Sequence, residues 1–281
     1  MTVLVFTTIV LLGSLGAGFL GALTGLGGGV VIIPLLALIL KVDIHYAIGA
    51  SLVSVIATSS GAAAAYVREG YTNLRIGMFL EIATTLGAIV GAVLAVWVPT
   101  SAIAVIFGMM LLFSAWMNLR PLPEHSELAH VDSIAAWLRM NGSYPAAGPD
   151  GPSQAYGAQR VPAGFALMGL AGVLSGLLGI GSGALKVLAM DQVMRLPFKV
   201  STTTSNFMIG VTAAASAGVY LSKGYIDPGI TMPVMLGVLA GSMLGAKVLV
   251  RARVRLLRWI FSAVIVALAI EMIRNGLRGT L

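Results

Sequence analysis

The stretch AGFLGALTGLGGG (17–29) returns as AGVLSGLLGIGSG (171–183), a shift of 154 residues from 17 to 171. At this shift the two halves of the chain align without a gap from about residue 17 to residue 92. Ser51 corresponds to Ser205, and Thr58 corresponds to Thr212. A chance similarity would need gaps over such a distance, so we interpret the pattern as a duplication.

Each half contains five apolar segments. In the first half they cover 3–24, 28–40, 46–66, 74–97 and 101–119, and in the second half 162–178, 182–194, 200–220, 228–250 and 257–275. The second segment of each half has only about a dozen residues and follows directly on a Gly cluster. It could be a full helix, a re-entrant half-helix or the far side of one broken span.

The composition indicates a membrane protein. Hydrophobic residues make up 58% of the 281 residues and charged residues only 10%, whereas a soluble domain has about 25% charged residues. Mean hydropathy is +0.98, and the apolar runs are long enough to cross a hydrocarbon core of about 30 Å. The first run has no basic leader, so we expect a retained span and not a signal peptide. Because the chain has no cysteine, disulfides, thiolate metal sites and a cysteine nucleophile are excluded.

The Lys and Arg residues of the loops predict the topology. If the first two segments of each half crossed the membrane only once together, these residues would divide about evenly between the two sides. If the segments cross or return separately, one side collects Arg68, Arg75, Arg120, Arg139, Arg160, Arg195, Lys199, Arg251, Arg253, Arg255 and Arg258. The other side then keeps Lys41, Lys223, Arg274 and Arg278. The positive-inside rule favours this second arrangement.

Five segments is an odd number, so the second half would enter the membrane upside down. We therefore predict an all-α integral membrane protein of two five-segment repeats in inverted topology, an architecture common among secondary transporters. It would lie in the cell inner membrane, with a cytoplasmic linker and both termini outside the cytoplasm. The net charge of +7 does not indicate nucleic-acid binding, because the basic residues lie in short loops and not on a soluble face.

The chain divides into a first repeat (1–119), a linker (120–161) and a second repeat (162–281). The linker is rich in Pro, Gly and Ser, a composition typical of flexible connectors. Within it, one helical face would carry Leu128, Val131, Ile134, Ala135 and Leu138, with Trp137 beside them. Either a short interfacial helix or a linker with a transient helix is consistent with this pattern.

The paired Gly clusters are the first candidates for a binding site. Glycine gives the backbone positive φ and close access to a ligand, and a half-helix that begins after a break points free N–H groups and its positive dipole end at an anion. Small residues also serve close helix packing in membranes. The occurrence of two clusters at equivalent places favours the functional interpretation. The candidate residues are Gly27, Gly28, Gly29, Gly181, Ser182 and Gly183.

Polar side chains inside the apolar segments supply further candidates. Lys186 would be the counter-charge for a bound anion, unless its stem extends to the headgroups or pairs with Asp191. Ser51, Ser205 and Asn206 are neutral donors for an oxyanion, or helix–helix contacts. Glu81 could carry a coupling proton, or pair with Arg75.

Other classes of site find little support in the sequence. The three histidines show no metal-ligand spacing, and nothing resembles a catalytic triad. We therefore expect no enzyme activity, no cofactor and no metal site. The oligomeric state stays open between a monomer and a homodimer.

The GLGGG stretch (25–29), its echo GIGSG (179–183), the motif AIGASL (47–52) and its echo at 200–206 resemble the TauE/SafE sulfite exporter family. The resemblance covers nearly the whole chain outside the linker. It implies transport, usually export, of sulfite or small organosulfonates. An uptake carrier for sulfur oxyanions or a divalent cation would share the architecture, and a membrane assembly protein without transport is a third alternative.

Overall fold

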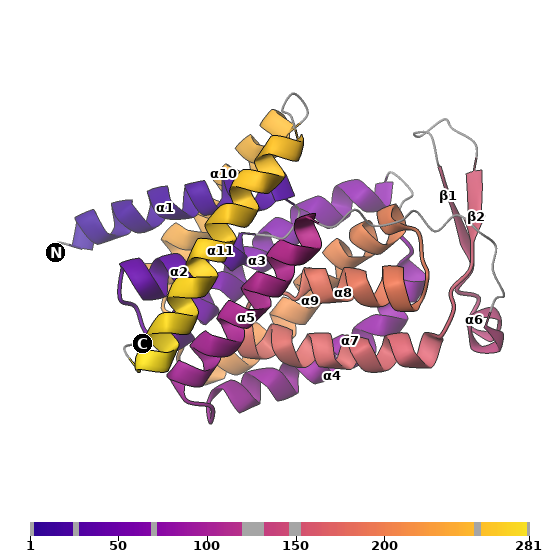
Figure 1. Cartoon of the computed structure of the whole chain (residues 1–281), viewed down its shortest axis with the longest axis horizontal. Coiled ribbons are helices and arrows are strands. Elements are labelled where there is room, and N and C mark those ends of the chain that lie inside the picture. The colour runs from indigo at the N-terminus through magenta and orange to yellow at the C-terminus, as the bar shows by residue number, and fades with distance from the viewer. Residues whose placement is uncertain are drawn as a thin grey trace.

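The computed structural model describes residues 3–24, 28–68, 72–119, 132–145, 153–249 and 254–279, and most of them are helical (Figure 1). The first half forms α1 (Val3–Thr24), α2 (Gly29–Pro34), the π-helical turn η1 (Leu35–Ile39), α3 (Ile44–Arg68), α4 (Leu74–Ala95) and α5 (Thr100–Leu119). The second half forms α7 (Val161–Leu178), α8 (Gly183–Leu188), η2 (Ala189–Val193), α9 (Phe198–Ser222), α10 (Pro228–Leu249) and α11 (Val254–Arg278).

The duplication is visible in the helix bounds. The shift of 154 residues carries both ends of α2, η1, α3 and α4 onto both ends of α8, η2, α9 and α10. The packing repeats as well: α1 contacts α10 as α7 contacts α4, α3 contacts α10 as α9 contacts α4, and α3 with α9 and α5 with α11 pair across the halves. Exchanging the two halves therefore leaves the pattern of helix pairs unchanged.

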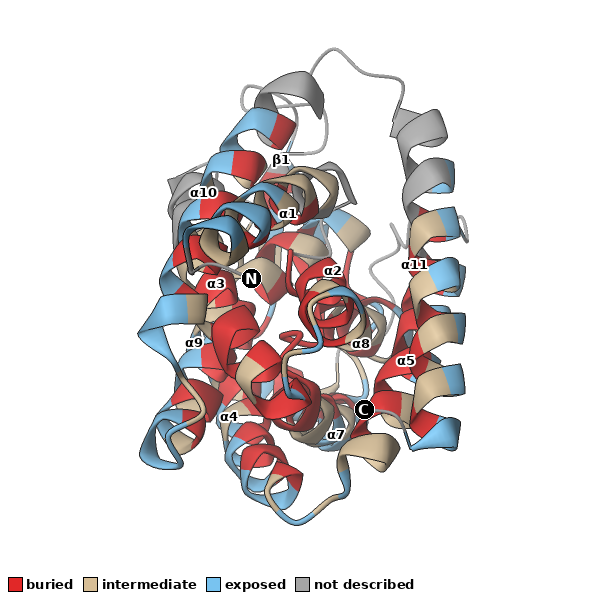
Figure 2. Ribbon diagram, turned by 90° about the vertical axis from the view of Figure 1, so that its left-hand side faces the viewer, coloured by how far each residue is buried: buried red, intermediate tan, exposed pale blue. Residues whose placement is uncertain are grey.

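The helices have the length and composition of membrane spans. Among the described residues, Leu74–Ala95, Thr100–Met117, Val161–Leu178 and Pro228–Gly245 are long and apolar enough to cross a bilayer. Large apolar side chains are exposed along these helices, while the interior is closely buried (Figure 2). This confirms the prediction of an all-α membrane protein.

The short segments do not cross the bilayer alone. α2 and η1 together cover residues 29–39, and α8 with η2 covers residues 183–193. At a rise of about 1.5 Å per residue each extends only about 17 Å, about half of the hydrocarbon core. Of the alternatives left open by the sequence, a full spanning helix is thus excluded for both.

Small residues bring the long helices into backbone contact. A Cβ built on Gly18 of α1 would lie 2.7 Å from Cα of Val238 on α10, and a Cβ on Gly172 of α7 would lie 2.8 Å from Cα of Thr84 on α4. These two contacts are equivalent under the repeat. Glycine is needed at both because any side chain would separate the helices.

Part of the linker forms defined structure: a short helix is one of the two alternatives that the sequence left open, whereas the strands were not predicted. A short helix, α6 (Ser133–Trp137), is followed by the antiparallel strands β1 (Gly142–Pro145) and β2 (Ser153–Tyr156). The hairpin lies at one end of the long axis, and both chain termini lie toward the other (Figure 1). On α6, Ala135 is buried and Trp137 is exposed. The predicted face continues to Leu128 and Val131, which lie outside the described residues.

Candidate functional site

The second Gly cluster interrupts the helix as predicted. α7 ends at Leu178, and the chain then turns through residues with positive φ: Gly179 at 67°, Gly181 at 71° and Ser182 at 47°. Glycine adopts this left-handed region without steric cost, which explains its presence here. α8 starts directly afterwards at Gly183. The chain is therefore broken in the middle of an apolar run.

The first Gly cluster is described in part. α1 ends at Thr24 and α2 starts at Gly29, with Gly28 as its N-cap residue. Gly27 lies outside the described residues. A Cβ built on Gly29 would lie 2.5 Å from Oγ of Ser51 and 3.5 Å from the carbonyl oxygen of Gly179. The start of α2 thus lies against the break of the other half.

Two serines that correspond under the repeat donate hydrogen bonds to the backbone around the second chain break. Ser51 on α3 donates its hydroxyl to the carbonyl oxygen of Gly179 at 2.9 Å, across the two halves. Ser205 on α9 donates to the carbonyl oxygen of Gly183 at 3.3 Å. Both side chains are buried. The first bond satisfies a backbone carbonyl that the end of α7 leaves without an intrahelical partner in an apolar interior, and the second ties the start of α8 to α9.

The remaining two candidates near the breaks differ in burial. Ser182 is 1% exposed, and among the residues that the structure describes its hydroxyl has no hydrogen-bond partner. A buried polar group without a partner costs about 1–3 kcal/mol, so this hydroxyl is available to a ligand. Asn206 is partly exposed on α9 and makes no hydrogen bond to the other candidates within the described part of the chain.

Lys186 lies in the interior. The residue is fully buried, and its Nζ donates to Oγ1 of Thr212 on α9 at 2.5 Å. It therefore does not extend to the headgroups. It does not bond to Asp191 either, whose Oδ2 accepts from Nε2 of Gln192 at 2.5 Å.

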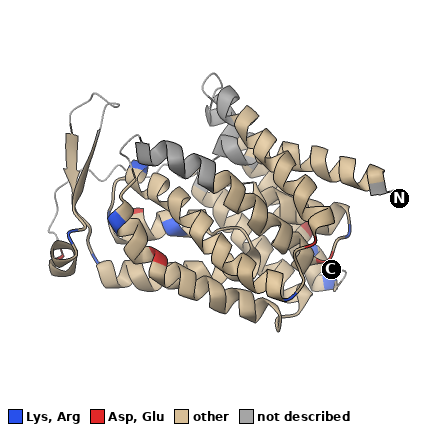
Figure 3. Ribbon diagram, turned by 180° about the vertical axis from the view of Figure 1, so that it is seen from behind, with Lys and Arg blue, Asp and Glu red and all other residues tan. Residues whose placement is uncertain are grey.

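Glu81 of α4 meets the same threonine. Its Oε1 accepts from Thr212 at 2.7 Å and from Thr85 at 3.0 Å, and the residue is only 7% exposed. The alternative pairing with Arg75 is absent, because that guanidinium donates to the carbonyl oxygen of Arg139 at 3.0 Å. Lys186 and Glu81, predicted separately, are thus joined through Thr212. The helices between the two ends of the molecule carry few other charges (Figure 3).

Sequence reasoning did not identify Thr212 as a site residue. Its correspondence to Thr58 placed it inside the repeat and indicated no chemistry. The available signal was its spacing on α9: Ser205 and Thr212 are seven residues apart, two helical turns, and therefore lie on one face. Such spacing is also common in packing faces and would not have singled out the residue.

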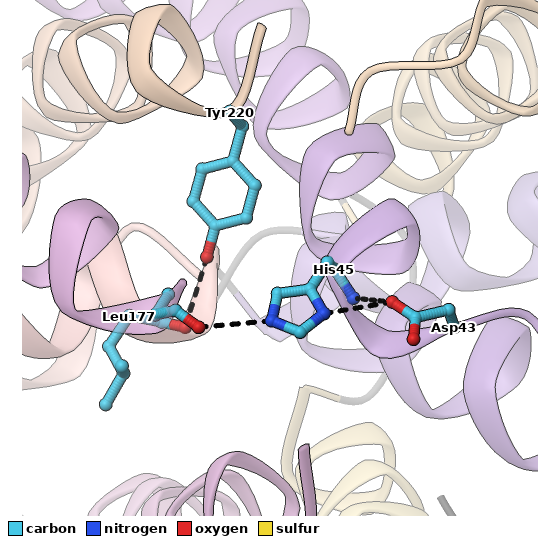
Figure 4. Close-up of polar contacts among 5 residues, drawn as sticks. Asp43, His45, Leu177 and Tyr220 are labelled. Carbon is cyan, nitrogen blue, oxygen red and sulfur yellow. Dashed lines mark hydrogen bonds and ion pairs between the residues drawn. The ribbon is translucent and has the colours of Figure 1, made fainter. Parts of the chain in front are cut away.

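A second polar cluster lies at the start of α3 (Figure 4). His45, which the sequence placed in a loop, is in the first turn of this helix and is 9% exposed. Its Nδ1 lies 3.0 Å from Oδ1 of Asp43 and its Nε2 lies 3.1 Å from the carbonyl oxygen of Ala95. The ring stacks on Tyr225 with 4.9 Å between centroids. These contacts tie the loop after α9 to the first half.

Among the described residues, no group of three or more His, Asp or Glu side chains could hold a metal ion. The arrangement instead combines a buried cation, serine hydroxyls and two chain breaks. It offers hydrogen-bond donors around a buried ammonium group that Thr212 joins to the carboxylate of Glu81.

Comparisons with known proteins place the chain among membrane transporters. The chain is 28% identical to the probable membrane transporter protein YunE of Bacillus subtilis, over 97% of this chain and 98% of that protein. It is also 28% identical to YdhB of the same organism, over 82% and 83% of the two chains, and to a probable membrane transporter protein of Xylella fastidiosa, over 94% of each. No solved structure matches the chain. A model of the sulfite exporter TauE/SafE family matches residues 10–272, and the chain therefore belongs to this family of multi-pass membrane transporters.

Proposed function

We propose that the protein is a secondary carrier, acting as an exporter, of a small sulfur-containing anion such as sulfite or a C2 sulfonate. The observation that carries the proposal is the fully buried ammonium group of Lys186, three residues after the start of a broken helix. A central intramembrane lysine costs about 2.5–3.5 kcal/mol of insertion free energy. Binding of a transported anion would explain why the chain carries a lysine at this position.

The anion would contact the residues around the two breaks. Lys186 supplies the charge, and the hydroxyls of Ser51, Ser182 and Ser205 supply hydrogen bonds without fixed charge, which allows release as well as binding. Backbone N–H groups of Gly27, Gly28, Gly29, Gly181 and Gly183 complete the set, and Asn206 would line the approach. The contact of Ser51 with Gly179 supports a single site between the halves.

We infer further that the halves are inverted repeats that alternate in opening to the two sides. The positions of equivalent loops support this. Asn73, after α3, donates to the hydroxyl of Tyr156 in the linker hairpin at 2.8 Å. Tyr225, after the equivalent helix α9, instead stacks on His45, whose Nε2 lies 3.1 Å from the carbonyl oxygen of Ala95, at the opposite end of α4 from Asn73. The positive-inside rule then assigns the hairpin to the cytoplasm of a cell with an inner membrane.

The membrane potential favours export of an anion. Each net negative charge that leaves an inside-negative cell gains about 2.3 kcal/mol per 100 mV. An uptake carrier for the same anions would use the same site in the other direction. A divalent-cation carrier is less well supported, because the buried Glu81 shares its threonine with a lysine, which would repel a cation.

Reconstituted protein tests the proposal. Proteoliposomes would be loaded in turn with sulfite, thiosulfate, sulfate and C2 sulfonates, and efflux measured for wild type, Lys186→Met and Lys223→Met. We expect at least about tenfold slower efflux for Lys186→Met, since the charge that holds the anion is removed. Lys223 is exposed after α9, so its variant should match wild type. Equal efflux from all three proteins would remove Lys186 from transport, and no efflux of any anion by wild type would favour an assembly protein.

A further inference from the structure

Three buried side chains, each from a different helix, are connected by hydrogen bonds. Lys186 of α8 donates to the hydroxyl of Thr212 on α9, which lies 2.7 Å from Oε1 of Glu81 on α4. Oε2 of Glu81 is buried and has no hydrogen-bond partner in the described part of the chain. Lysine and glutamate are therefore linked through one hydroxyl, and one carboxylate oxygen is left as an open acceptor.

The other half shows that the fold does not need these charges. Under the shift of 154 residues, Lys186 corresponds to Ile32 and Glu81 corresponds to Met235, while Thr212 corresponds to Thr58. Ile32 is fully buried in the first half. The chain thus builds the same arrangement of helices once with apolar residues and once with a lysine and a glutamate that are linked through a threonine. Buried charged groups, even when paired, rarely stabilise a fold more than apolar residues of similar size, so stability does not explain these two charges.

Charge balance limits what can bind beside the pair. Lys186 and Glu81 together carry no net charge, so an anion that bound Lys186 would leave one uncompensated negative charge in the protein interior. The effective penalty for an unpaired buried ion is several kcal/mol. One proton taken up from water by Oε2 of Glu81 removes that charge, and the neutral carboxyl group then releases Lys186 to the anion.

We propose that Glu81 competes with the transported anion for Lys186, so that each anion is bound together with one proton. The inference rests on the proposed anion transport and adds its coupling ion. One proton leaves water for Glu81 and one anion leaves water for Lys186, and both are released on the other side. A monoanion then crosses without net charge, whereas a dianion still carries one negative charge outward and gains from the membrane potential.

Few other titratable groups surround Glu81. α7 carries none along Val161–Leu178, and α9 has Lys199 in its first turn and Tyr220 near its end. The segment α8–η2 adds Asp191, which accepts from Gln192, and α4 itself adds Arg75, bonded to the carbonyl oxygen of Arg139. Lys186 is the cation joined to Glu81 by Thr212. It is therefore the main cation for which Glu81 and the anion compete.

The test uses 2-hydroxyethanesulfonate, because this sulfonate stays ionised at all pH values of interest and releases no proton of its own. Full-length protein in proteoliposomes, with the membrane potential clamped, would be followed by radiolabelled sulfonate and an internal pH dye. We expect one proton per sulfonate for wild type. Glu81→Gln should move the sulfonate without protons, because an amide cannot titrate. The control Glu271→Gln, a carboxylate exposed beside Arg274, should behave as wild type.

The outcomes separate the two proposals. Sulfonate movement by wild type without protons, or coupled protons in Glu81→Gln, overturns the coupling and leaves the carrier intact. No movement of sulfonate by wild type overturns both. If Glu81→Gln does not fold, the pH dependence of the sulfonate affinity of wild type decides: the affinity should fall as the pH rises, by up to tenfold per pH unit, as reciprocal linkage of one proton requires. An affinity independent of pH would contradict the proposal.

Discussion

Gly29 occupies a space that admits no side chain. Its virtual Cβ would lie 2.5 Å from Oγ of Ser51 and 3.1 Å from Cγ2 of Val55. Ser51 cannot move away without losing its hydrogen bond to the carbonyl oxygen of Gly179, which joins α3 to the chain break of the second half. A methyl group added at Gly29 would therefore disturb the contact between the two chain breaks.

We expect Gly29→Ala to lower the free energy of unfolding by about 1–3 kcal/mol, the cost of leaving a buried polar group without its partner. Thermal unfolding in detergent would measure it. Gly16→Ala is the matched control, since nothing lies within 4 Å of its Cβ, and it should be neutral or slightly stabilising. Equal losses in both variants would contradict this account of Gly29.

Ser51→Ala should cost about 1 kcal/mol through the same lost bond. Because both substitutions disturb one contact, the double variant Gly29→Ala/Ser51→Ala should lose less than the sum of the two single variants. The same unfolding measurement gives the coupling. Additive losses would show that Gly29 and Ser51 act independently.

At the scale of elements, the linker hairpin is attached to the helices by defined contacts. The hydroxyl of Tyr156 accepts from Nδ2 of Asn73 at 2.8 Å, and Tyr156 packs in one apolar cluster with Ile76 and Leu80 of α4. The backbone N–H of Gln159 also donates to the carbonyl oxygen of Met194, just after η2. The hairpin therefore contacts both halves at one end of the molecule.

Tyr156→Phe should weaken this attachment by about 0.5–1.5 kcal/mol, the net value of one hydrogen bond. Hydrogen exchange of the backbone amides in 153–160 would measure it as faster exchange. Tyr144→Phe is the control, because the hydroxyl of Tyr144 donates to Gln154 within the hairpin. Faster exchange in the control alone would contradict the assignment.

The hairpin should also respond to alkaline pH. Burial raises the pKa of the Tyr156 phenol above its ordinary value of 10.0, while the hydrogen bond from Asn73 acts in the opposite direction. A raised pKa in the folded state means that the stabilising contribution is complete below pH 10 and is lost as the pH rises through the folded pKa. The protection of the amides in 153–160, taken relative to their intrinsic base-catalysed exchange rate, should therefore fall above about pH 10 in wild type. Tyr156→Phe should not show this fall.

At the scale of the whole molecule, the inverted arrangement makes a sharp prediction about equivalent residues. Lys41 and Arg195 correspond under the repeat, both are exposed, and both have positive φ, at 54° and 52°. If the halves are inverted, these two residues lie on opposite sides of the membrane. If the halves are parallel, they lie on the same side.

Labelling can decide between the two arrangements, because the chain has no cysteine of its own. In intact cells, an impermeant maleimide should label Lys41→Cys and should label Arg195→Cys only after the membrane is opened. Ser143→Cys in the exposed part of the hairpin should follow Arg195→Cys, as a cytoplasmic linker requires. Labelling of Lys41→Cys and Arg195→Cys from the same side would contradict inversion and cytoplasmic placement together.

The sequence alone determined that the chain is a duplicated, helical membrane protein interrupted at its Gly clusters. These features follow from apolar run length, from residue correspondence at a fixed shift and from the backbone freedom of glycine, all of which are local properties. Lys186 and Glu81 also stood out, because charges are conspicuous in apolar segments. Their partners did not follow from the sequence, because Asp191 lies close to Lys186 along the chain and Arg75 lies close to Glu81.

Only the tertiary structure decided which of these residues meet. The bond from Thr212 to Glu81 joins residues 131 positions apart, and the bond from Ser51 to Gly179 joins residues 128 apart. Such contacts depend on how the helices cross and on the direction of each side chain, neither of which local sequence specifies. The hairpin in the linker likewise depends on apolar contacts with α4 and η2. Its Pro- and Gly-rich composition predicts only a connector.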